Sequence, residues 1–253
     1  MKEIFSKQNQ KIKELKKQKQ KNRFLLFLDN QKSIKDAQKF GLCPKVCLVD
    51  KEKLANFDLL VKNLENQGVE VIATSAEIIK DFATTQTPQG IVCAFDFLPK
   101  APTLPKGNFL VLDGLQDAGN VGTLLRSALG ANFCDVFLVD CVSLTNPKLV
   151  RSTMASLFAL NLVEISRADF AKFAVANNLP LICADMNGQN VFDFAPQGQI
   201  GLVVGSEGQG VSPELATLCN STLSIPMANG LESLNAGVAG SIIMFEIYKR
   251  REL

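Results

Sequence analysis

The segment NFLVLDGLQDAGNVGTLLRSALGANFCDVFLVD (108–140) decides the fold of the second half of the chain. An apolar run over 108–114 predicts a buried strand, 120–133 predicts a helix, and 134–140 predicts a second strand. A strand, a crossover helix and a second strand form the unit from which parallel sheets are built. The turn before the helix is rich in glycine and polar residues, which makes it a candidate binding loop.

The same alternation continues to the end of the chain. Further strands are expected over 160–166, 180–185, 200–206 and 221–227, and helices over 146–160, 212–219 and 234–251. Short apolar strands that alternate with helices predict an α/β fold, with a parallel sheet covered on both faces.

The first half predicts a smaller α/β domain. Strands are expected over 24–29, 46–50, 69–75 and 87–97, and helices over the N-terminal arm, 33–40, 53–68 and 76–84. Pro99, Pro102 and Pro105 stiffen the stretch 99–107, which we interpret as a linker. The chain is therefore divided into a domain at 1–98 and a domain at 108–253.

The composition excludes several classes of function. The chain has no histidine, so Ser-His, Cys-His and His-metal mechanisms are excluded. The cysteines are scattered without a C-x-x-C pair, and we expect neither a metal site nor a disulfide framework. No apolar run of about 18 residues and no secretory signal is present, so we expect no membrane contact and a cytoplasmic location.

The positive charge is concentrated at the N-terminus. Residues 1–23 hold only Glu3 and Glu14 as acids, against a series of basic residues: Lys2, Lys7, Lys11, Lys13, Lys16, Lys17, Lys19, Lys21 and Arg23. Such a basic arm can lie along the phosphates of a nucleic acid. The alternative is a solvated helix that binds no partner.

Ligands of open parallel sheets bind beyond the carboxyl ends of the strands, and two strand ends here carry glycine-rich loops. The first loop follows the strand at 108–114 and contains Asn120 and Gly122. Arg126 comes four residues after Gly122, on the same side of the predicted helix. The second loop, VVGSEGQGVS (203–212), surrounds Glu207 with glycines: Gly205, Gly208 and Gly210.

A third loop follows the strand that ends at Pro226. Here Ser233, Leu234 and Asn235 open a helix with small residues over 236–241. Small residues on one face let a helix press closely on another backbone. A tightly packed C-terminal helix would account for the small residues alone, but not for Ser233 and Asn235 at its start.

A dinucleotide-binding unit is an alternative interpretation of the first loop. Asp140 lies about 20 residues after the glycines, where a ribose-binding acid would sit. However, the loop is G-x-x-G rather than G-x-G-x-x-G, and no histidine is available for hydride transfer. We therefore disfavour a nicotinamide-dependent dehydrogenase.

Together the three loops resemble the three motifs of the SpoU/TrmH family of SPOUT methyltransferases, over roughly 108–253. The first motif is matched by Asn120, Gly122 and Arg126, the second by Gly205, Glu207, Gly208 and Gly210, and the third by Ile225, Pro226, Ser233, Leu234 and Asn235. One departure is that the family's Asp-Pro-x-Asn reads Asp117-Ala118-Gly119-Asn120 here.

The resemblance implies methylation of a ribose 2′-hydroxyl in RNA with S-adenosyl-L-methionine as the methyl donor. The basic arm and the two-domain layout favour rRNA over tRNA as the substrate. A tRNA 2′-O-methyltransferase is one alternative, and a non-catalytic RNA-binding protein that retains the fold is another.

The resemblance also implies an architecture. The second half would be a SPOUT domain whose parallel sheet carries a trefoil knot, and the protein would be a homodimer with its active site between two subunits. The final helix and the helix of the first motif would supply the interface. Residues 1–98, with TPQGIV at 87–92, resemble the family's RNA-binding domain, which is similar to a ribosomal protein.

The resemblance assigns roles to the motif residues. The cofactor is expected in the loops after strands ending at Gly205, Ile225 and Leu234, and the residues that bind it would be Gly205, Gly210, Ile225, Pro226, Leu234 and Asn235. The catalytic residues would be Asn120, Arg126, Glu207, Ser233 and Asn235.

Within this set Arg126 would lie nearest the hydroxyl, and Glu207 would orient Arg126 or Asn120. Ser233 and Asn235 would hold the ribose or the methionine end of the cofactor. Because arginine stays protonated, two proton routes are open. Arg126 and an RNA phosphate share the proton, or Arg126 fixes the phosphate while another group accepts the proton.

Overall fold

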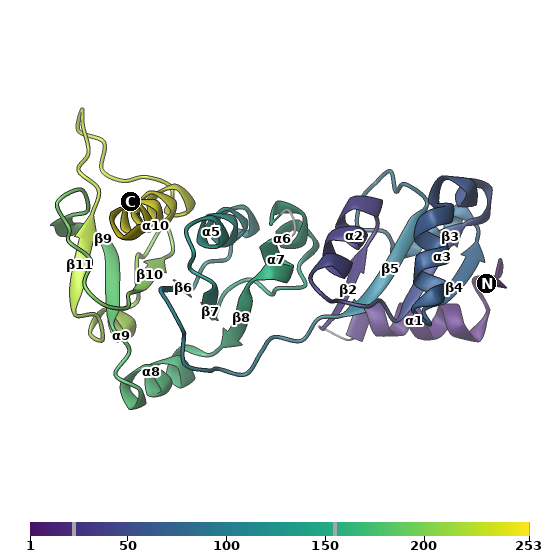
Figure 1. Ribbon diagram of the computed structural model, residues 1–253, viewed down its shortest axis with the longest axis horizontal. Coiled ribbons are helices and arrows are strands. Elements are labelled where there is room, and N and C mark those ends of the chain that lie inside the picture. Colours follow the sequence, from purple (N-terminus) through teal and green to yellow (C-terminus); the bar gives the residue numbers. More distant parts are fainter. Residues whose placement is uncertain (22–23, 154–155, 253) are drawn as a thin grey trace. The chain divides into compact units, whose positions relative to one another are not determined.

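The computed structural model of the protein describes residues 1–21, 24–153 and 156–252. The chain divides into two compact units, Met1–Leu98 (unit 1) and Pro99–Leu253 (unit 2), each with its own sheet (Figure 1). Two parts of the predictions, Arg23 in the basic arm and positions 154–155 in the helix predicted over 146–160, lie outside the described residues.

Unit 1 contains a five-stranded mixed sheet in the order β1-β4-β3-β5-β2. Its strands are β1 (Lys2–Glu3), β2 (Leu25–Leu28), β3 (Val46–Asp50), β4 (Glu70–Thr74) and β5 (Ile91–Asp96). β1, β4 and β3 run parallel to one another, whereas β5 is antiparallel to both β3 and β2. β1 was not predicted, because a strand of two residues shows no periodic pattern.

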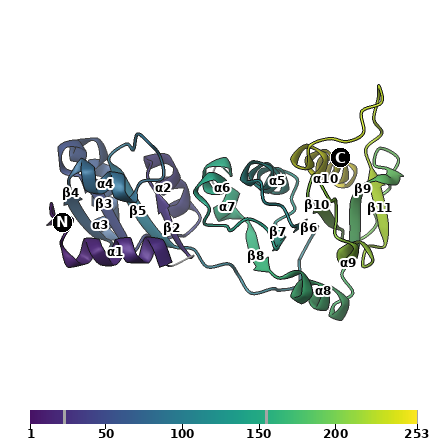
Figure 2. The same ribbon diagram turned by 180° about the vertical axis from the view of Figure 1, so that it is seen from behind.

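The helices of unit 1 lie on both faces of this sheet (Figures 1 and 2). They are α1 (Gln10–Lys21), α2 (Gln31–Lys39), the 3-10 helix η1 (Lys51–Phe57), α3 (Asp58–Asn66) and α4 (Ala76–Phe82). Ile12 and Leu15 of α1 pack with Ile78 and Phe82 of α4 in one buried cluster. The helix predicted over 53–68 therefore corresponds to a 3-10 helix followed by an α-helix.

The lysines of the N-terminal arm form two sets. Several contact acidic groups of unit 1: Lys2 and Lys11 pair with Glu70, and Lys7 and Lys16 pair with Asp81. Burial lowers the pKa of Lys19, whose Nζ donates to the backbone oxygens of Asp81 and Ala83. The second set is exposed, recurs every four residues along α1 and has no ion pair within the described part of the chain: Lys13, Lys17 and Lys21.

Unit 2 contains a six-stranded sheet in which every pair of neighbouring strands is parallel. The strands are β6 (Phe109–Asp113), β7 (Asp135–Val139), β8 (Asn161–Ile165), β9 (Leu181–Asn190), β10 (Gly201–Gly205) and β11 (Ser221–Ser224). Their order is β11-β9-β10-β6-β7-β8. The chain leaves β8 at one edge and returns to β9 on the other side of β6, so the strand order reverses next to β6 and β10.

Helices cover both faces of this sheet (Figures 1 and 2). They are α5 (Ala118–Gly130), α6 (Pro147–Ser152), α7 (Ser156–Ala159), α8 (Arg167–Ala176), α9 (Pro213–Ala216) and α10 (Ala236–Glu252). Phe170 of α8 and Leu215 of α9 pack on Phe109, Phe137 and Val203 of the sheet. On the opposite face, α10 packs along α5 and β10.

The predicted α/β class with a parallel sheet in the second half is confirmed. Helix α8 was not predicted, although a parallel β8–β9 connection requires a crossover segment. The final helix begins at Ala236 rather than Leu234. α5 begins at Ala118 rather than Asn120, because the Asp117 side chain caps it by accepting hydrogen bonds from the backbone N–H groups of Gly119 and Asn120.

Candidate functional site

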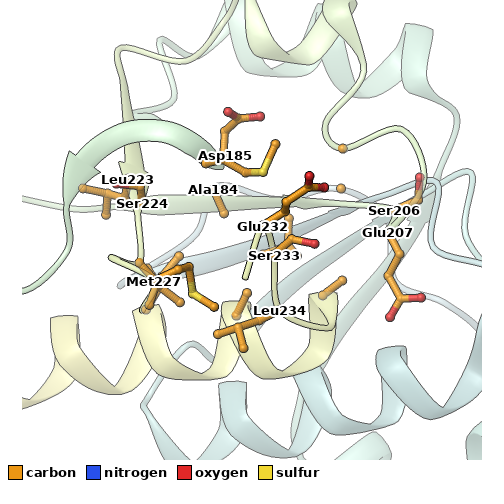
Figure 3. Close-up of a pocket in the computed structure, with 18 of the residues that line it drawn as sticks. Ala184, Asp185, Ser206, Glu207, Leu223, Ser224, Met227, Glu232, Ser233 and Leu234 are labelled. Carbon is orange, nitrogen blue, oxygen red and sulfur yellow. The ribbon is translucent and has the colours of Figure 1, made fainter. Parts of the chain in front are cut away.

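A cavity of about 660 Å³ lies at the carboxyl ends of β10 and β11 and against β9 (Figure 3). This volume is typical of a site for a small organic ligand. Its lining combines apolar side chains, such as Leu223 and Ile243, with the polar groups of Asp185, Glu207 and Glu232. In Figure 3 Glu207 lies at the opposite end of the cavity from Leu223.

The structure places most of the predicted site residues on this cavity. Seven of them line it: Gly205, Glu207, Gly210, Ile225, Pro226, Ser233 and Leu234. Asn120, Arg126 and Asn235 do not line it. Asn120 lies in the first turn of α5, Arg126 lies further along α5, and Asn235 directly precedes α10. Two of the predicted catalytic residues, Glu207 and Ser233, thus share the cavity with the predicted cofactor residues, whereas Asn235, predicted for both roles, lies outside its lining.

The loop after β10 folds back tightly on its own strand. Ser206 and Gly210 exchange backbone hydrogen bonds of 3.1 and 2.8 Å, which closes the loop around Glu207. A Cβ on Gly205 would overlap the backbone of Gly210, so only glycine allows this approach. Gly210 itself has a φ of +67°, a left-handed conformation that favours glycine. These glycines thus serve the turn that presents Glu207.

The loop between β11 and α10 supplies part of the apolar lining of the cavity. β11 ends at Ser224, and residues 225–235 contain no strand. The expectation that Leu234 ends a strand is therefore wrong. Pro226 has no N–H to donate to a strand partner, and the chain leaves the sheet just before it. Leu234 instead belongs to the loop, and its side chain lies beside the start of α10 in Figure 3.

Asn120, Glu207 and Asn235 form one hydrogen-bonded cluster. The Asn120 Nδ2 donates to Glu207 Oε1 at 2.9 Å, and the Asn235 Nδ2 donates to Asn120 Oδ1 at 2.8 Å. Asn235 Nδ2 also donates to Glu207 Oε1. One residue from each of the three predicted loops thus meets the others, which sequence spacing alone could not show.

Two helix starts hold the amides of this cluster. Asp117 Oδ1 accepts from the backbone N–H groups of Gly119 and Asn120, and a hydrogen bond from Lys148 lowers the pKa of Asp117. Asn235 caps α10, because its Oδ1 accepts from Val238 N at 3.2 Å. A Cβ on Gly237 would lie 3.4 Å from the Asn120 Cα, so the small residues of α10 allow the two helices to approach closely.

Arg126 lies apart from the cluster. It is exposed on α5 and does not line the cavity. It comes six positions after Asn120, which places the two side chains about 120° apart around an α-helix. Within the described part of the chain, no hydrogen bond or ion pair engages its guanidinium. The side chain is therefore available to a partner from outside this chain.

An ion pair between a buried carboxylate and a partly exposed arginine, at the neighbouring strand ends, was missed by the sequence analysis. Asp113 Oδ1, at the end of β6, accepts from Arg167 Nε at 3.0 Å and from Arg167 Nη2 at 2.8 Å. Asp113 Oδ2 accepts from the backbone N of Ser212 at 2.7 Å. A hydrogen bond with Asp113 raises the pKa of Arg167. An acid directly after an apolar strand was the available signal, but its partner is 54 positions away.

Asp140, the acid of the dinucleotide interpretation, faces the same arginine. Its Oδ2 accepts from the Arg167 backbone N at 3.3 Å and lies 3.7 Å from Arg167 Nη1. β6 lies between β7 and β10, the strand whose end lines the cavity. Asp140 therefore belongs to the ion-pair network and not to the cavity.

Two classes of feature were also sought among the described residues. Over 1–21, 24–153 and 156–252, no group of three or more Cys, Asp or Glu side chains is arranged to hold a metal ion. Within the same ranges, no helix has both the length and the apolar character needed to cross a membrane.

Comparisons with known proteins cover the part of the chain that carries this site. Residues 107–245 match the model of the SpoU rRNA Methylase family. This range includes the cavity, the hydrogen-bonded cluster and Arg126.

The chain is also similar in sequence to individual rRNA methyltransferases. The chain is 28% identical to the Bacillus subtilis 23S rRNA (guanosine(2553)-2′-O)-methyltransferase RlmP, over 98% of this chain and 99% of that protein. It is 31% identical to the Streptomyces viridochromogenes 23S rRNA (uridine(2479)-2′-O)-methyltransferase, over 74% of this chain and 70% of the relative.

A solved structure shares the fold of the whole chain. The AdoMet-bound rRNA methyltransferase from Sinorhizobium meliloti has a TM-score of 0.84 at 22% identity, and the match covers 99% of this chain and 98% of that one.

Proposed function

The chain belongs to the SpoU rRNA Methylase family, and we propose that it transfers a methyl group from S-adenosyl-L-methionine to a ribose 2′-hydroxyl of RNA. Ribosomal RNA is the proposed substrate. The relatives from Bacillus subtilis and Streptomyces viridochromogenes are both named for 2′-O-methylation of 23S rRNA, which supports this choice. A cytoplasmic location is part of the proposal, and it is supported by the bacterial source of these two relatives.

The observation that carries the proposal is the Asn120–Glu207–Asn235 cluster beside the cavity. Each residue comes from a different loop, and the three loops meet at the edge of the sheet where ligands of parallel folds bind. A protein that only bound RNA through unit 1 would have no need for this arrangement.

The cavity fits S-adenosyl-L-methionine in size and in chemistry. Apolar side chains such as Leu223, Ile225 and Leu234 suit the flat adenine ring, and acidic side chains such as Asp185 and Glu232 suit a ligand with positive charges. Gly205 and Gly210 would expose backbone groups to the polar edges of the ligand. When bound, this cofactor supplies an electrophilic methyl group.

The residues of the chain would place the ribose for in-line attack. Glu207 Oε1 already accepts hydrogen bonds from both amides, so we assign Glu207 the task of orienting Asn120 and Asn235. Ser233, on the cavity, and Asn235 would then hold the ribose or the methionine end of the cofactor. Placement of this kind supplies much of the rate gain in reactions between two bound partners.

Arg126 would act on the RNA itself. Its guanidinium remains protonated at neutral pH, so it would bind a phosphate next to the reacting 2′-hydroxyl rather than act as a free base. The hydroxyl proton would then pass to an oxygen of that phosphate or to another acceptor nearby. Both routes identified from the sequence remain compatible with an exposed Arg126.

A homodimer would bring Arg126 to a cavity. Arg126 does not line the cavity of its own chain, and a second copy that packs on α5 and α10 would add residues across the interface. Exposed apolar side chains on these two helices, Leu129, Val238 and Phe245, support such packing. Phe245→Glu should give a monomer in light scattering and abolish methylation, whereas a wild-type monomer with full activity would exclude this part of the proposal.

The path of the chain in unit 2 is proposed to form a trefoil knot. The support is the strand order, in which β10 lies between β6 and β9 while β11 lies beyond β9. The segment before α10 would then pass through the loop formed around β10.

Unit 1 is proposed to bind the RNA. The exposed row of Lys13, Lys17 and Lys21 on α1 supports contacts with phosphates, because these three lysines have no ion pair among the described residues. The paired lysines of the arm are assigned to the stability of unit 1.

The experiment that tests the function uses purified protein, methyl-labelled S-adenosyl-L-methionine and separate pools of unmodified rRNA and tRNA. Label in a 2′-O-methylnucleoside released from rRNA would support the proposal, and label from tRNA alone would replace the substrate. Binding of RNA without any methyl transfer, together with no binding of the cofactor in calorimetry, would favour a non-catalytic RNA-binding protein.

A further inference from the structure

The Asp113 carboxylate joins three elements at the edge of the unit 2 sheet. Its side chain is only 1% exposed at the end of β6. Oδ1 accepts both hydrogen bonds from Arg167 at the start of α8, and Oδ2 accepts from the backbone N of Ser212 at 2.7 Å. Both carboxylate oxygens are thus engaged, one by a charged partner and one by the loop that carries Glu207.

The loop over 206–211 has an anchor at each end. At its start, Gly205 lies directly opposite Asp113 in the β6–β10 ladder. At its end, Ser212 donates to the same Asp113. Between these anchors the backbone bonds of Ser206 and Gly210 close the loop. Both ends of the loop that carries Glu207 therefore adjoin the same residue of the neighbouring strand.

The surrounding charges explain why an acid can occupy this buried position. A carboxylate removed from water needs an opposite charge and hydrogen bonds to all its oxygens. Arg167 supplies the charge, and its Nη1 lies 3.7 Å from Asp140 Oδ2. Glu214 on α9 is the other acid that acts on Arg167. Neither of these acids contacts the loop through Ser212.

We propose that Asp113 is a positioning residue for methyl transfer, which holds the Ser212 N–H so that Glu207 meets Asn120 and Asn235. Asp113 lies outside the cavity and acts through the loop. The catalytic consequence rests on the proposed function, whereas the control of the loop does not.

Ser212→Pro and Ser212→Ala form a matched pair for the test. Ser212 has a φ of −59°, which proline also adopts, so Ser212→Pro removes the N–H donor while Asp113 and Arg167 remain. Ser212→Ala keeps the N–H and removes a hydroxyl that is buried without a hydrogen-bond partner among the described residues. Asp113→Asn is the second variant. An amide has one acceptor oxygen instead of two, so it can accept from Arg167 or from Ser212 but not from both in the present geometry.

The first readout is hydrogen exchange of the backbone over 206–211, which does not depend on activity. Loss of a hydrogen bond to a charged group should speed exchange of this segment by about tenfold or more in Ser212→Pro and Asp113→Asn. Exchange in β6 and in the Ser212→Ala protein should remain at the wild-type rate. Unchanged exchange over 206–211 in both Ser212→Pro and Asp113→Asn would overturn the proposal.

The second readout is kcat for methyl transfer in a double-mutant cycle with Glu207→Gln. Ser212→Pro should lower kcat by about tenfold in the wild-type background and have almost no further effect in the Glu207→Gln background. If the double variant instead loses the product of the two single-variant decreases in kcat, the Asp113–Ser212 hydrogen bond and Glu207 act independently. That result would overturn the proposed catalytic role of Asp113. A wild-type protein that transfers no methyl group would refute the proposed function, and the exchange experiment would still decide the role of Asp113.

Discussion

Both halves of the unit 2 sheet carry acidic residues, but the acids of the two halves have different surroundings. At β6, β7 and β8 the acids Asp113 and Asp140 meet Arg167 within the chain. In the half formed by β9, β10 and β11, Asp185 within β9 and Glu232 in the loop after β11 line a cavity. A charged residue after a strand therefore does not identify a binding site by itself. What separates the two halves is whether the chain also supplies the opposite charge.

The largest effect is expected from Arg126→Ala, because the exposed Arg126 side chain is available to a partner from outside the chain. Removal of a phosphate contact needed only in the reacting complex should lower methyl transfer by about 10³-fold or more. The affinity for S-adenosyl-L-methionine, measured by calorimetry, should stay within about twofold, because the proposed partner of Arg126 is an RNA phosphate and not the cofactor. Full methylation activity in this variant would contradict the role of Arg126.

Asn235→Asp separates the cluster from the helix cap. A carboxylate at position 235 can still accept from Val238 N, so the melting temperature should change little. It also places a second negative charge next to Glu207 and removes the two donors of the amide. We expect kcat to fall by about 100-fold. An unchanged kcat would mean that the cluster is only structural.

Arg167→Ala tests the half of the sheet formed by β6, β7 and β8 through the free energy of unfolding. It leaves Asp113 buried without its counter-charge, and we expect a loss of about 2 kcal/mol in urea unfolding, less than for a fully buried pair because the arginine is partly exposed. Lys172→Ala on the same helix removes only an exposed contact with Asp169 and should cost less than about 0.5 kcal/mol. Equal losses in the two variants would contradict the difference between the two halves.

The smallest effect concerns the exposed ion pairs of unit 1. Hydrogen bonds from Lys11 and Lys2 hold the pKa of Glu70 below its ordinary value. A carboxyl group whose pKa is lower in the folded state stabilises the fold at neutral pH, and this contribution is lost as the pH falls through the folded pKa. Glu70→Gln should therefore destabilise unit 1 slightly at pH 7 and hardly at pH 3, as measured by urea unfolding at both values. The same loss at both pH values would exclude this assignment.

The sequence predicted the parts of the site that follow directly from local patterns. Apolar strands ending in glycine-rich loops placed Glu207, Gly205 and Gly210 at the carboxyl edge of a parallel sheet, where the structure has them. The small residues over 236–241 predicted a close helix contact, and Gly237 lies against Asn120.

The remaining features depend on distant parts of the chain. Asp113 and Arg167 meet because β6 and the start of α8 share one edge of the sheet, which no local pattern shows. α8 was missed although its N-terminal residue completes this pair. Leu234 was placed at the end of a strand, but β11 already ends at Ser224, and Leu234 lines the cavity from the following loop.

The most direct test of the central claim is mass spectrometry of rRNA and tRNA from cells with and without this protein. We predict that one 2′-O-methylnucleotide disappears from rRNA when the protein is absent. It should return when the wild-type chain is supplied, but not when Arg126→Ala is supplied. Identical 2′-O-methylation of rRNA and tRNA in both kinds of cell would contradict the account.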